Sequence, residues 1–359
     1  MNAACLPRRG AFPRRAAAPQ FFLIQFSVFF IHFYSLLSKE NPRPENNASC
    51  AFRTSIGGQA LIEGILMRGP KKQAIVCRTA EGLVEKVDEL KLARDKYPVL
   101  GLPFLRGCAI FISSLVNGMQ ALTYSASLVP LEQQGEPDKL DKWIEEHFPE
   151  DKAQKLIIGL AVVMGIALSV LLFIFLPALL VGWCRPLTQS FFVRNLSEGA
   201  LKVVILLAYM KLVSNMSDIK RLFSYHGAEH KTIFCYEHGK ELTVENVRPE
   251  SRFHPRCGTS FLLVVVLVSI LVNSVVHVSH TLARVGCHLL LLPVVVGISY
   301  EINRWCGAHD NRLSAILSAP GKWLQRITTN EPDDGMIECA IRAMALVIPE
   351  EKGSDIWGQ

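Results

Sequence analysis

Two pairs of long apolar segments dominate the second half of the chain. The first pair comprises residues 156–181 and 201–213, and the second comprises residues 260–278 and 285–298. An α-helix of about 20 apolar residues has the length required to cross the hydrocarbon core of a bilayer. We therefore predict two transmembrane helical hairpins within residues 156–300.

The N-terminal half has a shorter apolar period. Residues 73–78 and 83–90 alternate apolar and polar side chains, and residues 79–82, which end in a glycine, separate them. Two alternating segments with a short glycine-containing connection predict a β-hairpin. Just before this hairpin, residues 56–70 interleave glycines with short apolar pieces. We interpret these glycines as turn formers, because the segment lacks both common phosphate-binding glycine patterns.

Further helical segments lie on both sides of the predicted membrane domain. Residues 107–131 are uncharged but contain recurring polar side chains, so we predict a helix that lies on or dips into the membrane surface. Near the C-terminus we predict a helix at residues 313–327, interrupted at residues 319–321, and a final helix to Val347 with its N-cap within residues 328–334. The predicted fold is an α-helical polytopic membrane protein with a small β-hairpin-containing N-terminal part and a helical C-terminal tail.

The chain begins with 39 residues that contain four arginines and neither Asp nor Glu, including an apolar run at residues 21–37. Such a start is typical of an organelle transit peptide, although the apolar run also fits a signal anchor. We favour targeting, and hence a chloroplast or other organelle membrane. We thus divide the chain into four regions: a targeting extension and linker (1–50), a soluble or interfacial region with the glycine-rich hairpin part and an amphipathic helix (51–155), the membrane domain (156–300) and the helical tail (301–359).

The composition favours a membrane protein over a nucleic-acid-binding one. Hydrophobic residues make up 50% of the chain, and the mean hydropathy is +0.26. The net charge of +6 is too small to indicate a nucleic-acid-binding surface. The ten cysteines form no CxxC pair, which predicts free thiols in a reducing compartment.

The distribution of lysine and arginine predicts which segments share a membrane face. The polar regions carry most of the positive charge, whereas the two hairpin turns hold only Arg185, Arg194 and Arg284. By the positive-inside rule, the polar regions, including the loop between the hairpins, share the cytoplasmic, stromal or matrix face. We expect the lipid bilayer, an unknown substrate and other membrane proteins as partners, and no nucleic acid.

The loop between the hairpins contains the strongest candidate chemistry, an HxxEH motif at residues 226–230. If residues 219–236 form a helix, His226 and His230 lie one turn apart on one face, with Glu229 beside them. Two neutral imidazoles at this spacing can hold a divalent ion such as zinc, while the carboxylate takes a proton from water. We therefore predict a metal held by the two histidines, with Glu229 as general base. The alternative is a pair of histidines hydrogen-bonded within the protein.

A second motif, HPRC at residues 254–257, lies at the entrance to the second hairpin. His254 and Cys257 are candidate ligands: if both bind the metal, the tetrahedral site is closed and structural, and if one binds, a position stays open for water. The proline after His254 disfavours a helix there and predicts a turn. The alternative interpretation is a tight turn that places Arg256 at the lipid headgroups. The candidate substrate-binding or supporting residues are Arg256, Glu63, Arg68 and Glu301, of which the arginines suit an anionic group.

Sequence blocks spread over residues 55–347 carry a family resemblance. They are GGQA at 57–60, MRGP at 67–70, YHGAEHKT at 225–232, HPRCGTS at 254–260, GISYE at 297–301 and EPDD at 331–334. With these blocks the chain resembles the YqhQ family of bacterial and organellar membrane proteins of unknown function. The resemblance implies an integral membrane protein with a metal-dependent activity, here with an N-terminal extension that departs from the bacterial form.

Two functions from different classes are consistent with this sequence. The first is a membrane-embedded metal-dependent enzyme, most simply a hydrolase, in which Glu229 acts on water beside a divalent metal. The alternative is a non-enzymatic membrane scaffold or assembly factor whose metal is structural. A transporter is disfavoured because the strongest apolar segments contain no acidic residue.

Overall fold

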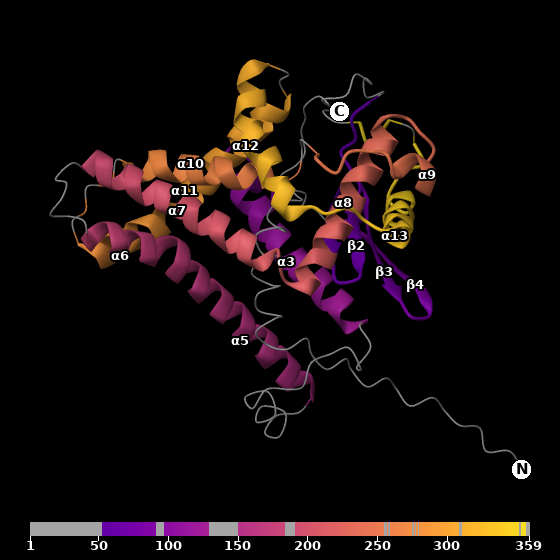
Figure 1. The fold of residues 1–359 in the computed structure, drawn as a ribbon, viewed down its shortest axis with the longest axis horizontal. Coiled ribbons are helices and arrows are strands. Elements are labelled where there is room, and N and C mark those ends of the chain that lie inside the picture. The colour runs from indigo at the N-terminus through magenta and orange to yellow at the C-terminus, as the bar shows by residue number, and fades with distance from the viewer. Residues whose placement is uncertain are drawn as a thin grey trace, which may run out of the picture.

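A bundle of long helices joins a small antiparallel sheet in the computed structural model of the chain (Figure 1). The predicted targeting segment and Arg256 lie outside the residues that the structure describes. The described residues are 52–90, 97–128, 150–183, 191–254, 257, 259–274, 276, 278, 280–308, 311–351 and 353–356.

The sheet has four strands in the order β1-β2-β3-β4, each antiparallel to its neighbour. The predicted hairpin is confirmed by β3 and β4, whose register pairs Thr79 with Gly82. The turn interpretation is wrong for Gly57, Gly58 and Gly64, which lie within β1 and β2. The alternation signal is weak there because the five-residue strands are buried along most of their length. The strands are β1 (Gly57–Leu61), β2 (Gly64–Arg68), β3 (Lys72–Thr79) and β4 (Gly82–Glu89).

Three helices cover or adjoin this sheet. Helix α8 (Ser217–Glu237) packs on β1, and α13 (Asp334–Ala345) packs on β2 and β3. The short α9 (Val244–Val247) contacts both helices. Apolar side chains from the sheet and from both long helices are fully buried between them, and this core fixes one face of α8 in place.

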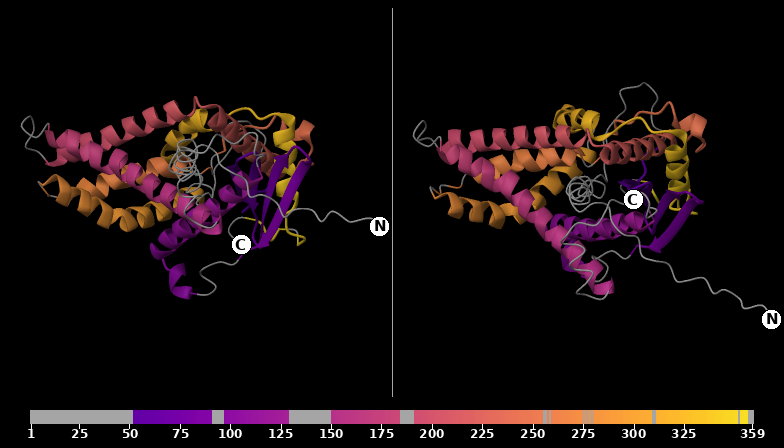
Figure 2. Two further views of the ribbon diagram at one scale, coloured as in Figure 1. Left: turned by 90° about the horizontal axis from the view of Figure 1, so that it is seen from below. Right: turned by 60° about the horizontal axis from the view of Figure 1, so that its bottom comes forward.

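The bundle extends away from the sheet, and in both views of Figure 2 one long helix, α5 (Glu150–Val170), slants away from the others. Two of its segments, Gly159–Trp183 and Leu282–Cys306, are long and apolar enough to cross a membrane, and Phe261–Ser274 is a shorter apolar segment. The bundle elements are η1 (Pro98–Gly101), α3 (Leu105–Ser127), α5 (Glu150–Val170), the π-helical η3 (Leu171–Phe175), α6 (Leu176–Trp183), α7 (Phe191–Val213), α10 (Thr259–Ser274), α11 (Thr281–Ala308) and α12 (Arg312–Thr328).

Several predicted boundaries in the bundle are wrong. Helix α7 begins ten residues before the predicted apolar segment, so Arg194 is a buried helical residue and Lys202 lies inside the helix. Arg284 is likewise buried in α11 and does not belong to a turn. The predicted break in α12 is absent, since the helix continues through Pro320. A proline lacks the N–H that would donate to the carbonyl four residues earlier, which here belongs to Ile316. Ile316 is 66% exposed, so water can solvate this carbonyl instead.

Candidate metal centre

Helix α8 carries the two motif histidines into the protein interior. Its observed extent, Ser217–Glu237, confirms the helix predicted at residues 219–236. Asp218 in the first turn complements the helix dipole, and Gly239, at φ 68°, takes the left-handed conformation common just after a helix. His226 is 4% exposed and His230 is 1% exposed, with their ring centroids 4.4 Å apart. The prediction that these side chains lie one turn apart on the same side of the helix is therefore confirmed, and at this point α8 is buried all round, from Tyr225 to Cys235.

Backbone carbonyls fix the tautomer of both imidazoles. The Nδ1 atom of His226 lies 2.9 Å from the carbonyl oxygen of Thr328, and that of His230 lies 2.6 Å from the carbonyl oxygen of Arg252. A carbonyl only accepts hydrogen bonds, so each Nδ1 carries the proton and each Nε2 presents a lone pair. Burial lowers the pKa of His226 to about 4 and lowers the pKa of His230 well below its ordinary value. Both rings are therefore neutral and oriented for ligation.

Cys257 brings a third donor atom to the pair. Its backbone N–H donates to the carbonyl of His254 at 3.2 Å, which confirms the turn predicted from the proline between them. Its Sγ lies 3.2 Å from Nε2 of His226. One ligand atom from each of Cys257, His226 and His230 lies within 4.8 Å of the other two. These three buried residues form what we call the His-His-Cys cluster.

His254, the fourth predicted ligand, lies beside this cluster without belonging to it. Its ring centroid is 5.6 Å from that of His230, but its Nε2 lies 3.6 Å from a carboxylate oxygen of Glu237. Its ring also makes an edge contact with Phe234, at 4.5 Å between centroids. The structure thus brings together three of the four predicted ligands, and it pairs the fourth with a buried acid.

Glu229, the predicted general base, is held against the sheet. Its Oε1 accepts a hydrogen bond of 3.0 Å from the backbone N–H of Gly58 in β1. Burial raises the pKa of this carboxyl to about 8, although the hydrogen bond opposes that shift. A Cβ at Gly58 would lie 2.9 Å from the Glu229 side chain, so glycine permits this close approach. Among the described residues, Glu229 is not part of the three-donor cluster.

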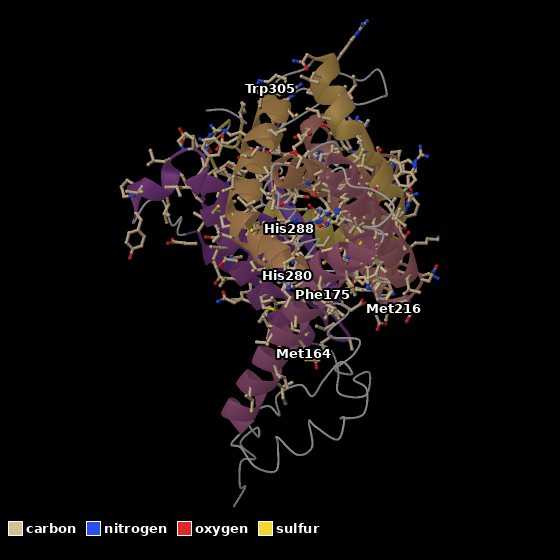
Figure 3. All side chains as sticks on the ribbon, turned by 90° about the vertical axis from the view of Figure 1, so that its left-hand side faces the viewer. Met164, Phe175, Met216, His280, His288 and Trp305 are labelled. Atoms are coloured by element: carbon tan, nitrogen blue, oxygen red, sulfur yellow. The ribbon has the colours of Figure 1, made fainter. Side chains whose placement is uncertain are left out.

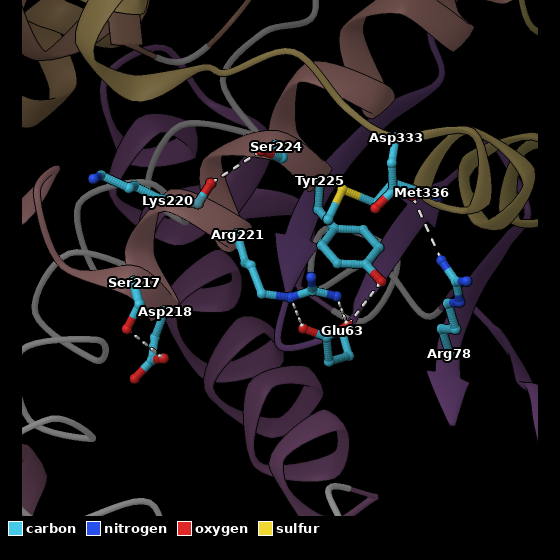
Figure 4. Close-up of polar contacts among 10 residues, drawn as sticks. All are labelled: Glu63, Arg78, Ser217, Asp218, Lys220, Arg221, Ser224, Tyr225, Asp333 and Met336. Atoms are coloured by element: carbon cyan, nitrogen blue, oxygen red, sulfur yellow. Dashed lines mark hydrogen bonds and ion pairs between the residues drawn. The ribbon is translucent and has the colours of Figure 1, made fainter. Parts of the chain in front are cut away.

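The remaining candidate site residues form ion pairs or hydrogen bonds elsewhere. Glu63 occupies the β1–β2 turn at φ 49° and accepts hydrogen bonds from Arg221 and Tyr225 of α8, as Figure 4 shows. These contacts attach the sheet to α8, which is a structural role. Arg68 donates a hydrogen bond to Gln73 at 2.8 Å, and burial lowers the pKa of Arg68 to about 10.

Glu301, the last of these candidates, pairs with the guanidinium of Arg106. One of the two hydrogen bonds is 2.7 Å long and joins Nε of the arginine to Oε1 of Glu301. The pair links α11 to α3 within the bundle, so Glu301 does not face the His-His-Cys cluster.

The main-chain partners of the histidines were missed by sequence reasoning. The carbonyls of Arg252 and Thr328 belong to segments far apart in sequence, and no side-chain pattern marks them. The sequence signal at residues 328–334 indicated only an N-cap, and Asp333 does cap α13 by accepting from the N–H of Met336.

Fold and site together define a helix-bundle protein with a buried His-His-Cys cluster at the junction with a small sheet. Residues 102–350 match the family model described as "Protein of unknown function (DUF1385)". The chain belongs to this family. It is 35% identical over 294 residues to "Uncharacterized protein YqhQ" of Bacillus subtilis (strain 168), a match that covers 80% of this chain and 90% of that protein. No solved structure matches the chain.

Proposed function

We propose that this chain is a membrane metalloenzyme with hydrolase activity, whose divalent ion, zinc or a similar metal, is held by the His-His-Cys cluster. The observation that carries the proposal is the pair of backbone carbonyls that occupy both Nδ1 atoms and leave both Nε2 lone pairs for a ligand, with that of His226 3.2 Å from the Cys257 sulfur. Hydrogen bonds of this kind orient metal-bound histidines and raise their basicity.

The donor set fits zinc by its chemistry. Imidazole nitrogen and thiolate sulfur are both common zinc ligands, and three protein ligands leave one of four tetrahedral positions for substrate or solvent. Loading would require Cys257 to lose its proton. A metal held in this way supplies a Lewis acid that polarises a carbonyl or phosphoryl oxygen.

The protein supplies the proton-transfer group in this proposal. Glu229 precedes the ligand His230, and its carboxyl is fixed by the amide of Gly58. A pKa raised to about 8 makes the ionised carboxylate a stronger base than an ordinary one, and the ionised fraction increases as the pH approaches that value. In the proposed reaction Glu229 takes a proton from the attacking water and returns it to the leaving group.

A structural metal is the second candidate, and the burial of the donors favours it. His226, His230 and Cys257 are 4%, 1% and 8% exposed, as in a site that stabilises a fold without admitting substrate. In that case the chain is a membrane scaffold or assembly factor, and Glu229 serves only to attach α8 to the sheet.

The membrane placement that we propose is multi-pass, in an organelle membrane, with the cluster on the stromal, matrix or cytoplasmic side. Two segments long and apolar enough to span a bilayer support it. So does the position of the sheet and α8 together at one end of the bundle (Figure 1). A tag after Gln359 should be protected or cleaved together with a site in the loop before α10, and opposite accessibility would contradict this topology.

Metal analysis of the purified full-length protein tests the site directly. We expect about one metal ion per chain in the wild type, with loss of that ion in His230→Ala and in Cys257→Ser. Cys235→Ser is the matched control, because Cys235 is a buried thiol on the same helix as the histidines but lies outside the cluster. A wild type without stoichiometric metal, or a Cys257→Ser variant that keeps it, contradicts the proposed ligand set.

Cobalt substitution separates the enzyme from the scaffold. A tetrahedral cobalt–thiolate site absorbs visible light, and a small added ligand such as cyanide changes the spectrum only if a position is open. The enzyme proposal expects this change, together with a Glu229→Gln variant that keeps its metal but no longer hydrolyses an activated aryl ester. A cobalt spectrum that does not respond to added ligand favours the structural site.

A further inference from the structure

A buried group of charged side chains lies at the end of the bundle far from the sheet, where α6 leads toward α7 and α10 leads toward α11. Figure 3 looks at the molecule from this end, with His280 and His288 labelled. We call the group the Glu198 cluster. It consists of Asn195, Glu198 and Lys202 of α7, Asn273 of α10, and Arg284 and His288 of α11.

One carboxylate is shared by two cations in this cluster. Lys202 Nζ lies 2.9 Å from Oε1 of Glu198, and an Arg284 nitrogen lies 2.6 Å from Oε2. His288 Nδ1 is 3.3 Å from Oε1. The side chains of Glu198, Arg284 and His288 are each less than 5% exposed, and that of Lys202 is 13% exposed. These charges therefore interact in a poorly solvated environment, where an unbalanced charge is costly.

The surrounding sequence offers no second acid to balance the second cation. Glu198 is the only acidic residue within 156–217 and 259–300, the segments that contain both predicted hairpins. Helices α3 and α12, which pack against α11 and α10, contain no Asp or Glu either. The cluster therefore has an excess positive charge with histidine counted as neutral, and a counter-ion would have to come from outside the chain.

The cluster also contains a small cavity with donor groups. Asn195, Glu198, Lys202, Arg284 and His288 line it. Nε of Arg284, a donor, is buried and lacks a hydrogen-bond partner among the described residues, and so do both ring nitrogens of His288, both carboxylate oxygens of Glu198 and Oδ1 of Asn273. Buried polar groups are normally satisfied, so such atoms indicate a missing ligand or water.

Close helix packing limits the size of any ligand at this cavity. Gly199 faces α10 so closely that a Cβ there would lie 2.2 Å from Cγ1 of Ile270. Both of these residues line the cavity. A bulky anion such as a phosphate monoester does not suit a space bounded in this way, whereas a single water-sized ion does.

From the charge excess, the open Nε donor of Arg284 and the tight walls, we propose that the Glu198 cluster binds a small monovalent anion such as chloride. The anion lies in this cavity, where the charges of Arg284 and Lys202 together exceed that of Glu198, and it stabilises the packing of α7 against α11. This site is independent of the His-His-Cys cluster, because it involves none of the same residues.

Anion-dependent thermal stability tests the proposal on the full-length protein in detergent. Chloride replaces gluconate at constant ionic strength, and Tm is followed as a function of chloride concentration. We expect Tm of the wild type to rise and then saturate. In Glu198→Gln, which removes the one opposing charge, the half-saturating chloride concentration should fall at least ~10-fold. Lys211→Gln, which changes an exposed cation of the same helix, should respond as the wild type does.

Glu198→Gln distinguishes an anion site from a simple ion-pair network, because only an anion site binds chloride more tightly when the opposing carboxylate is removed. If the cluster is only structural, this variant loses stability equally in chloride and gluconate, and its chloride response does not tighten. That result, or a wild-type Tm that does not depend on which anion is present, overturns the proposal. Arg284→Gln should abolish the saturable response. If Arg284→Gln does not fold, the responses of the wild type and of Glu198→Gln are sufficient to support or overturn the anion site.

Discussion

The His-His-Cys cluster and the Glu198 cluster bury polar side chains in opposite ways. The first contains uncharged donors, and each histidine is satisfied by a backbone carbonyl on one nitrogen. The second contains formal charges that satisfy one another only in part. A neutral cluster is tolerated without a ligand, whereas the charged cluster depends on opposite charges that its own residues supply only in part. The two should therefore respond very differently to the loss of one side chain.

The largest expected effect is the loss of a cation from the charged cluster. Arg284→Gln breaks the buried pair with Oε2 of Glu198 and leaves Lys202 as the cation beside it, so the cost should at most approach about 3–5 kcal/mol, the cost for a buried pair that loses its only partner. The variant should show this loss in chemical denaturation at fixed detergent and chloride concentration. Lys211→Gln is the control. An Arg284→Gln variant as stable as the wild type would mean that solvent reaches the cluster, and the contrast with the neutral cluster would disappear.

Metal removal should produce the next largest effect, and only at the neutral cluster. An ion present at about 100 times its Kd stabilises the folded state by about 2.7 kcal/mol. A strong chelator should therefore lower the stability of the wild type and of Cys235→Ser by this order. It should leave His230→Ala unchanged, because that variant has no ion to lose. Equal chelator sensitivity of all three proteins would place the metal elsewhere.

A smaller effect is expected where Glu229 meets the sheet. In Gly58→Ala the new methyl group lies 2.8 Å from the Met67 sulfur and 2.9 Å from the Glu229 side chain, so these flexible groups must move. Overpacking of this kind costs about 1–3 kcal/mol. Metal content should stay at the wild-type value while ester hydrolysis falls. Gly101→Ala, where no atom lies within 4 Å of the new methyl, is the control.

The smallest effect is expected at an exposed ion pair, where the same kind of residue is lost as at Arg284. Arg342 of α13 donates hydrogen bonds to Glu85 of β4 in solvent, and these lower the pKa of the Glu85 carboxyl. A lowered carboxyl pKa stabilises the fold above the unfolded value of about 4.3, and this contribution is lost as pH falls through the folded pKa. The Tm difference between Arg342→Gln and the wild type should be small at pH 7 and vanish in acid. A difference as large as that of Arg284→Gln would contradict the role of burial.

Local sequence rules were sufficient to predict the local structure around the His-His-Cys cluster. The helix predicted at residues 219–236 is present and places His226 and His230 one turn apart, although residues 225–235 are buried on all sides and not along one face. The turn at His254 followed from its proline. Both features could be predicted because a helix and a proline-induced turn each depend on residues close together in the sequence.

Positions decided by contacts between distant segments were not predictable in this way. His254 was expected near the metal but lies against Glu237, because its orientation depends on packing of the loop against α8. Residues 319–321 were expected to interrupt a helix, yet solvent exposure of the turn before Pro320 allows α12 to continue.

Glu198 shows the same limit for charged residues. It precedes the apolar segment predicted at residues 201–213, and the polar residues Arg194, Asn195 and Ser197 come just before it. The structure extends α7 through all of these positions, so the helix contains an acid that the predicted segment does not. The partners of Glu198 come from α7 and α11, up to about 90 residues away, so no motif links them. Charge pairs across helices are visible only when the helices are packed.

The wide π-helical turn at Leu171–Phe175 changes the phase of the first long apolar helix. In a regular α-helix, residues 18 positions apart lie on the same face, because 18 residues make five turns. Val163 and Val181 have this spacing, yet Val163 is 63% exposed and Val181 is 8% exposed. The extra residue that a π turn accommodates rotates α6 relative to α5 by about 100°. The first half of this continuous segment, α5, therefore exposes an apolar stripe, whereas the second half, α6, packs against α7. The π turn lets each half take its own rotation about the helix axis.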